Sequence, residues 1–434
     1  MWTIDRYIEN IIEAADVNRR CGETPMNRCI LSAALVLALA PAPLLAAPKA
    51  RPAAAVSEAP AWRSAWGNAP IAPQAVARPG EARAFTDVTV RQVMRLNAGG
   101  EAVRLRLSNE LNERPLAVGA ITLAPADADG KILGPPIAVT VGGKAEFTIP
   151  PGAPVLSDPV TLPVKAMDYV SAAIFYVGTQ APAGHRVRLF VAPPGNHVAK
   201  DAIPGEQALK GPGLISGVEV RGPGEAPVLV AIGDSITEGS GSTPNADKGW
   251  PEQLAARLSA RGQGWSVVNM GVGGGRLLRE VSGPSALSRF DRDVLSVAGV
   301  KAVVVLEGIN DIGRPAQPGF AADAVTPEDL IAGYRQLIAR AHARGVKIYG
   351  GVIPPFEGAA YYHDKGEATR QAVNAWIRTG GEFDGVVDFD AVLRDPAKPG
   401  QLRGEAHGGD HLHPNDAGYA LMAEAADRVL FPAK

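Results

Sequence analysis

Two patterns of apolar and polar positions divide the chain. Between about residues 84 and 193, short segments alternate apolar and polar residues with a period of two, which is typical of strands with one buried face. Turn clusters such as Asp127-Ala128-Asp129-Gly130 separate these segments. The pattern predicts an all-β, sandwich-like domain over residues 84–222. Its expected strands are 88–96, 103–108, 118–123, 145–149, 169–177 and 187–191.

The pattern changes at about residue 226. Short continuous apolar runs, which are typical of strands buried on both faces, now alternate with segments of helical periodicity. The expected strands are 227–232, 266–270, 301–306, 347–353 and 385–389, and the expected helices are 250–258, 286–295, 327–343, 367–378 and 415–430. Thr326 and Pro327 suit the N-cap and first position of the third helix. Residues 226–434 are therefore predicted to form a parallel sheet with helices on both faces, an α/β fold.

The N-terminal segment is predicted to be a leader. Residues 26–28 give a short basic start, an apolar run follows from 30 to 47, and small residues close it, as in a secretory signal. We expect residues 1–47 to contain a signal peptide, with Met26 as a second candidate start, and residues 48–83 to form an Ala/Pro-rich linker. The mature protein would then be exported, periplasmic or extracellular, without a membrane span. An N-terminal anchor helix is the alternative.

Composition limits the possible chemistry. The chain of 434 residues has 43 Lys and Arg against 45 Asp and Glu, a formal net charge of −2, so nucleic acid is not an expected partner. Of all residues only 2 are cysteines, Cys21 and Cys29, and both precede the two predicted domains. Disulfides, thiolate metal sites and a cysteine nucleophile are therefore not expected in those domains.

A nucleophile and a base can be proposed from two segments. Ser235 follows the first predicted strand of the α/β domain, and the preceding Gly233 permits a sharp turn that displays the serine at the sheet edge. Asp410 precedes His413 by three residues, so its carboxylate can orient the imidazole of a general base. Each segment alone is equally compatible with an ordinary turn or helix cap.

Two further segments offer hydrogen-bond donors. Gly274 lies in the glycine-rich loop after the second strand, and Asn310 follows the third. With the backbone N–H of Ser235, they could stabilise the oxyanion of an acyl-transfer intermediate. Taken singly, both are plain turn segments. The glycine loop lacks the lysine of a P-loop and the spacing of a dinucleotide fingerprint, so phosphate binding is disfavoured.

These four segments, in this order, resemble the SGNH (GDSL-type) hydrolase family over about residues 227–430. The resemblance implies a flavodoxin-like α/β/α sandwich, a catalytic set of Ser235, Asp410 and His413, and an oxyanion hole of Ser235, Gly274 and Asn310. It implies neither a metal nor a cofactor. Ile236 stands where the motif that names the family has leucine, a variation that is common within it.

The segments 306–313 and 409–419 look like the branch of arylesterases and xylan-associated acylhydrolases. That likeness implies hydrolysis of short-chain, above all acetyl, carboxylic esters on small molecules or plant polysaccharides. The segments 238–242, 273–276 and 407–409 agree with it, because they are mostly small or polar and contain no amphipathic insertion that could form a lid. A lipase or lysophospholipase-type acylhydrolase is the alternative.

Other interpretations remain open from the sequence. A zinc hydrolase could use the cluster His407, Asp410, His411 and His413, although this leaves Ser235, Gly274 and Asn310 without a role. The β domain could bind glycan, but its few aromatic residues fall mostly in apolar strands, where core packing is expected. Arg276, Glu307 and Asp311 flank the catalytic segments and could either shape the substrate site or form structural ion pairs.

Overall fold

The computed structural model describes residues 61–73, 81–223 and 227–432. The predicted leader, the second candidate start at Met26 and most of the predicted linker lie outside the described residues. Among the described helices, none combines the length and the apolar character that a membrane crossing requires.

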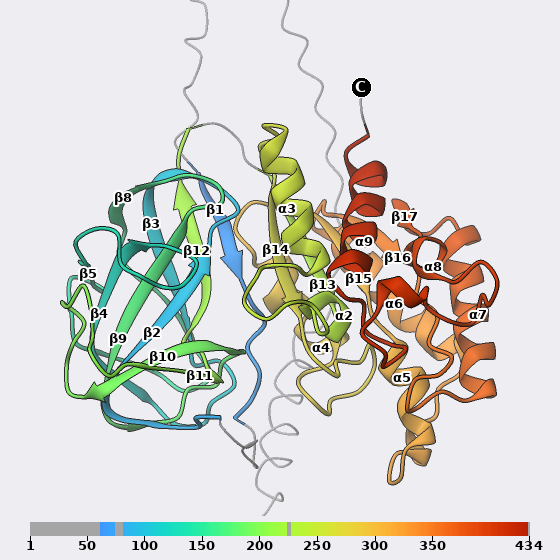
Figure 1. Cartoon of the computed structure of the whole chain (residues 1–434), viewed down its shortest axis with the longest axis horizontal. Helices are drawn as coiled ribbons and strands as arrows, with labels where there is room; N and C mark the ends of the chain where they lie inside the picture. The colour runs from blue at the N-terminus through green and yellow to red at the C-terminus, as the bar shows by residue number, and fades with distance from the viewer. Residues whose placement is uncertain (1–60, 74–80, 224–226, 433–434) are drawn as a thin grey trace, which may run out of the picture. The chain divides into compact units, whose positions relative to one another are not determined.

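The first part of the described chain consists of two antiparallel sheets (Figure 1). One has the order β1-β12-β3-β7, with β8 also pairing with β3, and the other has the order β11-β10-β2-β9-β4-β5, with β6 also pairing with β4. The strands are β1 (Trp62–Gly67), β2 (Phe85–Arg95), β3 (Gly100–Ser108), β4 (Leu116–Ala126), β5 (Ile137–Val139), β6 (Phe147–Ile149), β7 (Pro154–Leu156), β8 (Val160–Val164), β9 (Tyr169–Gln180), β10 (Arg186–Pro194), β11 (Gln207–Pro212) and β12 (Ile215–Arg221).

Both sheets contribute to one core, as the period-two pattern predicts. Val103, Leu105 and Leu107 of β3 are fully buried, and they share a cluster with Val170 and Ile174 of β9 in the other sheet. Side chains from two sheets that meet in one apolar layer define a sandwich. The prediction of an all-β domain before the α/β domain is therefore confirmed.

The prediction of a linker over residues 48–83 is wrong for Trp62–Gly67. This segment is strand β1, which pairs antiparallel with β12. The guanidinium groups of Arg104 and Arg221 lie 4.3 and 5.1 Å from the Trp62 ring centroid, and Ala65 is fully buried. Alanine and proline dominate the composition around this strand, so the composition predicts a linker even though a few residues of the segment pack against the sheet.

The second part contains a sheet of five parallel strands in the order β14-β13-β15-β16-β17. In chain order this is 2-1-3-4-5, the flavodoxin-like arrangement, which confirms the predicted fold class. The strands are β13 (Val228–Gly233), β14 (Ser266–Gly271), β15 (Val300–Leu306), β16 (Lys347–Gly351) and β17 (Gly385–Val387).

Helices cover both faces of this sheet. Alternate residues of β13 point to opposite sides: Val230 packs in the core formed with α4, α6 and α7, whereas Leu229 packs in the core formed with α3, α8 and α9. The helices are α2 (Ser235–Glu238), α3 (Trp250–Ala260), α4 (Ala286–Phe290), α5 (Ile309–Gly313), α6 (Pro327–Ala343), α7 (Asp364–Thr379), α8 (Phe389–Leu393) and α9 (Asp416–Leu430).

Two helix boundaries show how local sequence sets the structure. Helix α6 begins as predicted: Thr326 is the N-cap, Pro327 is at the first turn, and Asp329 completes a capping box. The predicted helix 286–295 is instead two pieces, because the five residues Asp291–Leu295 form a π-helical turn after α4. Apolar periodicity does not distinguish one such turn from α-helix.

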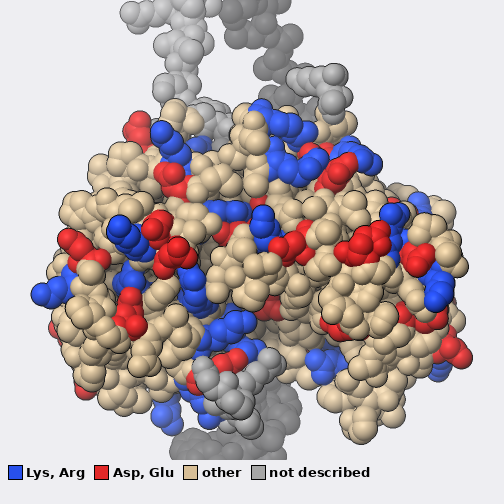
Figure 2. All heavy atoms as spheres, in the orientation of Figure 1, with Lys and Arg blue, Asp and Glu red and all other residues tan. Residues whose placement is uncertain are grey.

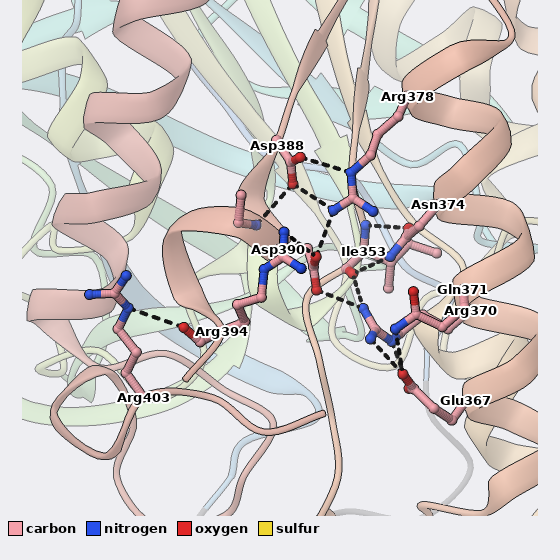
Figure 3. Close-up of polar contacts among 11 residues, drawn as sticks. Ile353, Glu367, Arg370, Gln371, Asn374, Arg378, Asp388, Asp390, Arg394 and Arg403 are labelled. Atoms are coloured by element: carbon pink, nitrogen blue, oxygen red, sulfur yellow. Dashed lines mark hydrogen bonds and ion pairs between the residues drawn. The ribbon is translucent and has the colours of Figure 1, made fainter. Parts of the chain in front are cut away.

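A buried polar network fixes the segment that follows β16 (Figure 3). Arg370 of α7 has no exposed side-chain surface, and it donates to the Ile353 carbonyl and to Asp390 at 2.8 Å each. Asn374 also bonds to the backbone of Ile353, accepting from its N–H and donating to its carbonyl at 2.9 Å each. These bonds satisfy buried groups that would otherwise be costly, and they anchor the start of the loop that leads to Tyr361.

The described residues of the β-rich and α/β parts belong to one compact unit. Asn97 Nδ2 donates to the Val267 carbonyl of β14 at 2.6 Å, and the Tyr169 hydroxyl donates to Asp247 at 2.6 Å. A Cβ on Gly67 of β1 would lie 2.8 Å from Met270 Cε, so these strands approach closely. On the face in Figure 2, acidic and basic side chains are interspersed, as a net charge of −2 leads one to expect.

Candidate active site

Ser235 lies at the carboxyl end of β13. The next strand in the chain, β14, pairs with one side of β13, and β15 pairs with its other side, so the strand order reverses at β13. Ligands bind at this switch point in open parallel sheets. Asp234 caps the helix α2 by accepting the N–H of Ile236 at 2.8 Å. A Cβ on Gly233 would overlap the Leu306 carbonyl and the Thr237 hydroxyl, so only glycine allows this turn. Ser235 is 8% exposed.

His413 connects Ser235 to Asp410. Its Nε2 lies 2.8 Å from Ser235 Oγ, and its Nδ1 lies 2.6 Å from Asp410 Oδ2. Because a carboxylate only accepts, the hydrogen on the neutral ring belongs on Nδ1 and Nε2 is free to accept from the serine hydroxyl. The structure therefore brings together the predicted nucleophile, base and orienting carboxylate.

The loop before α9 holds this arrangement. Asp410 Oδ1 accepts the backbone N–H groups of Leu412 and His413 at 3.0 and 2.9 Å, which turns the chain so that Oδ2 reaches the imidazole. Burial raises the pKa of Asp410, but the bonds to the backbone and to His413 outweigh it and leave that pKa below its ordinary value. Asp410 therefore stays a carboxylate at neutral pH.

Asn310 lies in the first turn of α5, directly after β15. Its Nδ2 donates to the Gly275 carbonyl at 2.9 Å, and its Oδ1 accepts from the Tyr361 hydroxyl at 3.4 Å. A side-chain amide nitrogen carries two hydrogens, so one remains for a ligand. Sequence reasoning missed Tyr361, which is separated from Asn310 by 51 positions and has no motif around it.

Gly274 has a φ of +72°, a left-handed conformation that favours glycine. A Cβ there would overlap the Ser282 hydroxyl and lie 2.7 Å from Arg314 Nη2. Conformation and space therefore both require glycine. The side chains nearest to this position, Ser282 and Arg314, are polar, so a group bound beside Gly274 would meet little apolar surface.

Carboxyl groups are buried beneath these residues. Asp234, Glu307 and Asp311 are each 1% exposed, and burial is the main cause that raises the pKa of all three, that of Asp311 to about 6. Arg289 Nη2, 3.6 Å from Glu307, supplies a positive charge. The buried Arg276 bonds to Asp323 at 2.7 Å, and Asp311 accepts the N–H groups of Leu277 and Leu278. These contacts favour the structural interpretation of Arg276, Glu307 and Asp311.

The histidine cluster does not have the geometry of a zinc site. His413 and Asp410 bond to each other, His407 Nδ1 accepts the Gly409 N–H at 3.0 Å, and the rings of His407 and His411 lie 4.7 Å apart. Within residues 61–73, 81–223 and 227–432, no group of three or more His, Cys, Asp or Glu residues is arranged to hold a metal ion.

This part of the chain is similar to known proteins. Residues 231–421 match the model of the GDSL-like lipase/acylhydrolase family. Axe2, an acetyl xylan esterase from Geobacillus stearothermophilus studied as a variant, is 23% identical, with 47% of this chain and 94% of that chain covered and a TM-score of 0.38. LAE5, an alpha/beta hydrolase enzyme from the metagenome of Lake Arreo, is 24% identical, with 47% and 95% covered and a TM-score of 0.36.

Comparison with curated proteins finds no match. The family match spans the strand ends that carry Ser235, Gly274 and Asn310 as well as the loop with Asp410 and His413. Residues 231–421, the part of the chain that carries this site, are therefore similar to the GDSL-like lipase/acylhydrolase family, and this similarity supports the enzymatic class of a carboxylic ester hydrolase.

Proposed function

We propose that the protein hydrolyses short-chain carboxylic esters, acetyl esters above all, with Ser235 as nucleophile, His413 as general base and Asp410 as the orienting carboxylate. The observation that carries the proposal is the continuous contact from Ser235 Oγ through His413 to Asp410, at 2.8 and 2.6 Å. A nucleophile within reach of a base that is itself oriented by a third group is the arrangement that acyl transfer requires.

The reaction follows from these contacts. Ser235 Oγ attacks the ester carbonyl carbon as its proton moves to His413 Nε2, and the Asp410 carboxylate stabilises the resulting imidazolium through Nδ1–H. Collapse of the tetrahedral intermediate breaks the ester C–O bond, and the alcohol leaves with the proton from Nε2. Water then attacks the acyl-enzyme in the same way, which releases the carboxylic acid and restores Ser235.

Three donors would stabilise the oxyanion: the backbone N–H groups of Ser235 and Gly274 and the second Nδ2 hydrogen of Asn310. Asn310 is 5% exposed, and its Nδ2 is held by the Gly275 carbonyl at 2.9 Å, so the orientation of the amide is set before substrate binds. A donor that need not reorganise during the reaction is worth more than one that must.

The preference for short acyl groups rests on the surroundings of Gly274. Ser282 and Arg314 are its nearest side chains, and glycines precede and follow it, so this side offers a long acyl chain little apolar surface. Each buried CH₂ contributes about 0.8 kcal/mol only where such surface exists. The likeness to xylan-associated acylhydrolases favours acetylated polysaccharides or their fragments, and the predicted leader favours action in the periplasm or outside the cell.

The test compares kcat/KM for nitrophenyl acetate, butyrate, octanoate and palmitate, together with acetate release from acetylated xylan, for the wild type and Ser235→Ala. We expect a decline from acetate to palmitate and no measurable turnover by the variant. A rise toward palmitate would instead favour the lipase alternative. Activity of Ser235→Ala near that of the wild type would overturn the serine mechanism itself.

A further inference from the structure

His185 extends from the β-rich part toward the active site. It lies between β9 and β10 and is 8% exposed. The N–H of Gly213 donates to the His185 carbonyl at 2.9 Å, and a Cβ on Gly184 would overlap the Gly213 carbonyl. The backbone that carries this imidazole is therefore fixed by close contact within the β-rich part.

Both ring nitrogens of His185 face acceptors. Nδ1 lies 3.0 Å from the carbonyl oxygen of Ala69, and Nε2 lies 3.0 Å from Glu238 Oε1. A neutral imidazole has only one N–H, so both contacts form only with the doubly protonated ring. Burial lowers the pKa of His185 and the charge of Arg289 does so too, but the bonds to Glu238 and Ala69 and the Glu238 charge outweigh them and raise it.

Glu238 connects the helix that begins at Ser235 with the glycine loop that contains Gly274. It is the last residue of α2, three positions after Ser235, and its carboxylate lies beside Gly273, which precedes Gly274. A Cβ on Gly273 would lie 2.6 Å from Glu238 Oε2, so this carboxylate lies directly against the glycine loop. Burial raises the pKa of Glu238, but His185, the Gly273 N–H and the charge of Lys210 together lower it.

We propose that His185 is a positioning residue for catalysis, because its imidazolium holds the Glu238 carboxylate against Gly273 and thereby sets the direction of the Gly274 N–H. This inference rests on the proposed function, in which Gly274 is an oxyanion donor. It gives the β-rich part a defined role: one side chain of that part completes the support of the oxyanion hole. His185 itself touches neither the substrate nor the reacting atoms.

A purely structural role makes a different prediction. If His185 only helped to join the β-rich and α/β parts, its loss would resemble the loss of other contacts between them. Tyr169→Phe is the matched control, because it removes a 2.6 Å hydrogen bond to Asp247 between the same two parts and leaves Glu238 untouched. Thermal unfolding of each variant would report how much each contact contributes to stability.

The experiment measures kcat and KM for nitrophenyl acetate with the full chain and its variants His185→Gln, Glu238→Ala and Tyr169→Phe, and with the His185→Gln/Glu238→Ala double variant. We expect His185→Gln to lower kcat about 10-fold with KM changed less than about 2-fold, since the oxyanion charge exists only in the transition state. Tyr169→Phe should keep the wild-type kcat. The double variant should be no slower than Glu238→Ala alone, because both substitutions interrupt one connection.

The pH profile provides a second readout. The raised pKa of His185 means that the connection is intact below that pKa and is lost as pH rises through it, so wild-type kcat should fall on the alkaline side. Glu238→Gln should abolish this fall, because a glutamine N–H can donate to the neutral imidazole. Two other charges act on this pair: Arg289 lowers the pKa of His185, and Lys210 lowers the pKa of Glu238. Both residues are present in the wild type and in all of these variants.

Two results would overturn the inference. One is a kcat of His185→Gln equal to that of Tyr169→Phe, and the other is additive losses in the double variant. If either result is found and Ser235→Ala is inactive, only the role of His185 is wrong and the serine mechanism remains supported. An active Ser235→Ala enzyme would instead show that the proposed function had failed.

Discussion

The two parts of the molecule use their polar side chains differently. In the α/β part, Ser235 and Asn310 come directly after strands of one parallel sheet, and His413 reaches the same place from the loop before α9. In the β-rich part, antiparallel strands distribute their polar residues over both sheets, and the predicted catalytic residues include none of them. A parallel sheet gathers side chains that are distant in sequence at one edge, whereas an antiparallel sandwich does not.

The difference indicates that substitutions in the two parts should have different effects. In the α/β part, the loss of one polar group can remove chemistry while the fold remains. In the β-rich part, the same kind of loss should appear in stability, except where a side chain reaches the catalytic loops, as His185 does.

The largest difference is expected between two serines. Ser235→Ala should lower kcat by on the order of 10⁴- to 10⁶-fold, as when the nucleophile of a catalytic triad is removed. In the β-rich part, Ser157 Oγ accepts the Leu105 N–H at 2.9 Å, and Ser157→Ala should cost about 1–2 kcal/mol of stability and leave kcat unchanged. Steady-state rates and urea unfolding of both variants test the pair. Comparable losses of kcat would contradict the contrast.

Arginines in the two parts should contribute differently to the free energy of unfolding. Arg370→Ala removes the fully buried partner of Asp390, which is 2% exposed and keeps its 2.6 Å bond to Arg378, and should lower the free energy of unfolding by about 2–4 kcal/mol. Arg106 of β3, 22% exposed and paired with Glu110, is the control, and its replacement by alanine should cost about 1 kcal/mol or less. Urea unfolding at one pH measures both values. A smaller loss for Arg370→Ala than for the control would show that the network in Figure 3 contributes little.

Two asparagines that donate to backbone carbonyls provide a third comparison. Asn310→Ala should lower kcat about 10²- to 10³-fold with a smaller effect on KM, as expected for one oxyanion donor. Asn97 donates to the Val267 carbonyl between the two parts, and Asn97→Ala should retain kcat within about 2-fold. Normal kcat with raised KM in Asn310→Ala would show that this amide only binds substrate.

Much of this arrangement could be predicted from the sequence, because strand ends and short-range spacing are local. The apolar run 227–232 predicts the strand before Ser235, and the spacing of three positions predicts the pair of Asp410 and His413. The nucleophile and the base can therefore each be predicted from a short segment of the sequence. Tyr361 and His185 could not be predicted in the same way. Their contacts with Asn310 and Glu238 depend on how a loop and a second part of the chain pack, and neither lies in a motif.

The strands that sequence reasoning missed have physical reasons of their own. β5 and β7 have three residues each, too few for a period of two to be recognised. In β12, Ser216 and Gly217 follow the first residue, so the alternation of apolar and polar residues is limited to its last four positions, 218–221. The prediction for residues 145–149 includes β6, because Phe147 and Ile149 alternate there.

Acidic groups in the two parts should respond to pH in opposite ways. Burial raises the pKa of Glu252 in α3 to about 7, whereas hydrogen bonds from Thr140 and from the N–H groups of Gly143 and Gly142 lower the pKa of Asp158 in the β-rich part. For a raised pKa the folded state binds more protons, so the stability from Glu252 is full below pH 4.5 and is lost as pH rises toward 7.

Glu252→Gln removes this dependence and retains an oxygen that can accept from Asn269 Nδ2, which now bonds to Glu252 Oε1 at 2.8 Å. The variant should be more stable than the wild type by about 1–2 kcal/mol at pH 8 and indistinguishable from it near pH 4. Urea unfolding at both pH values measures the difference. A variant that is less stable at pH 8 would mean that the Glu252 carboxylate is charged and well paired in the folded protein.

The smallest expected effect concerns Tyr361, whose hydroxyl lies 3.4 Å from Asn310 Oδ1. That separation exceeds the usual length of an O–H···O bond, so the hydroxyl orients the amide only weakly and the Gly275 carbonyl, at 2.9 Å from Nδ2, does most of it. Tyr361→Phe keeps the ring and should lower kcat about 2- to 4-fold, far less than Asn310→Ala. The β-rich part offers Tyr169→Phe as control, with a shorter bond of 2.6 Å and no expected change in kcat. If Tyr361→Phe lost as much activity as Asn310→Ala, the hydroxyl would have to act on the substrate directly, and bond length would be a poor guide to function in this site.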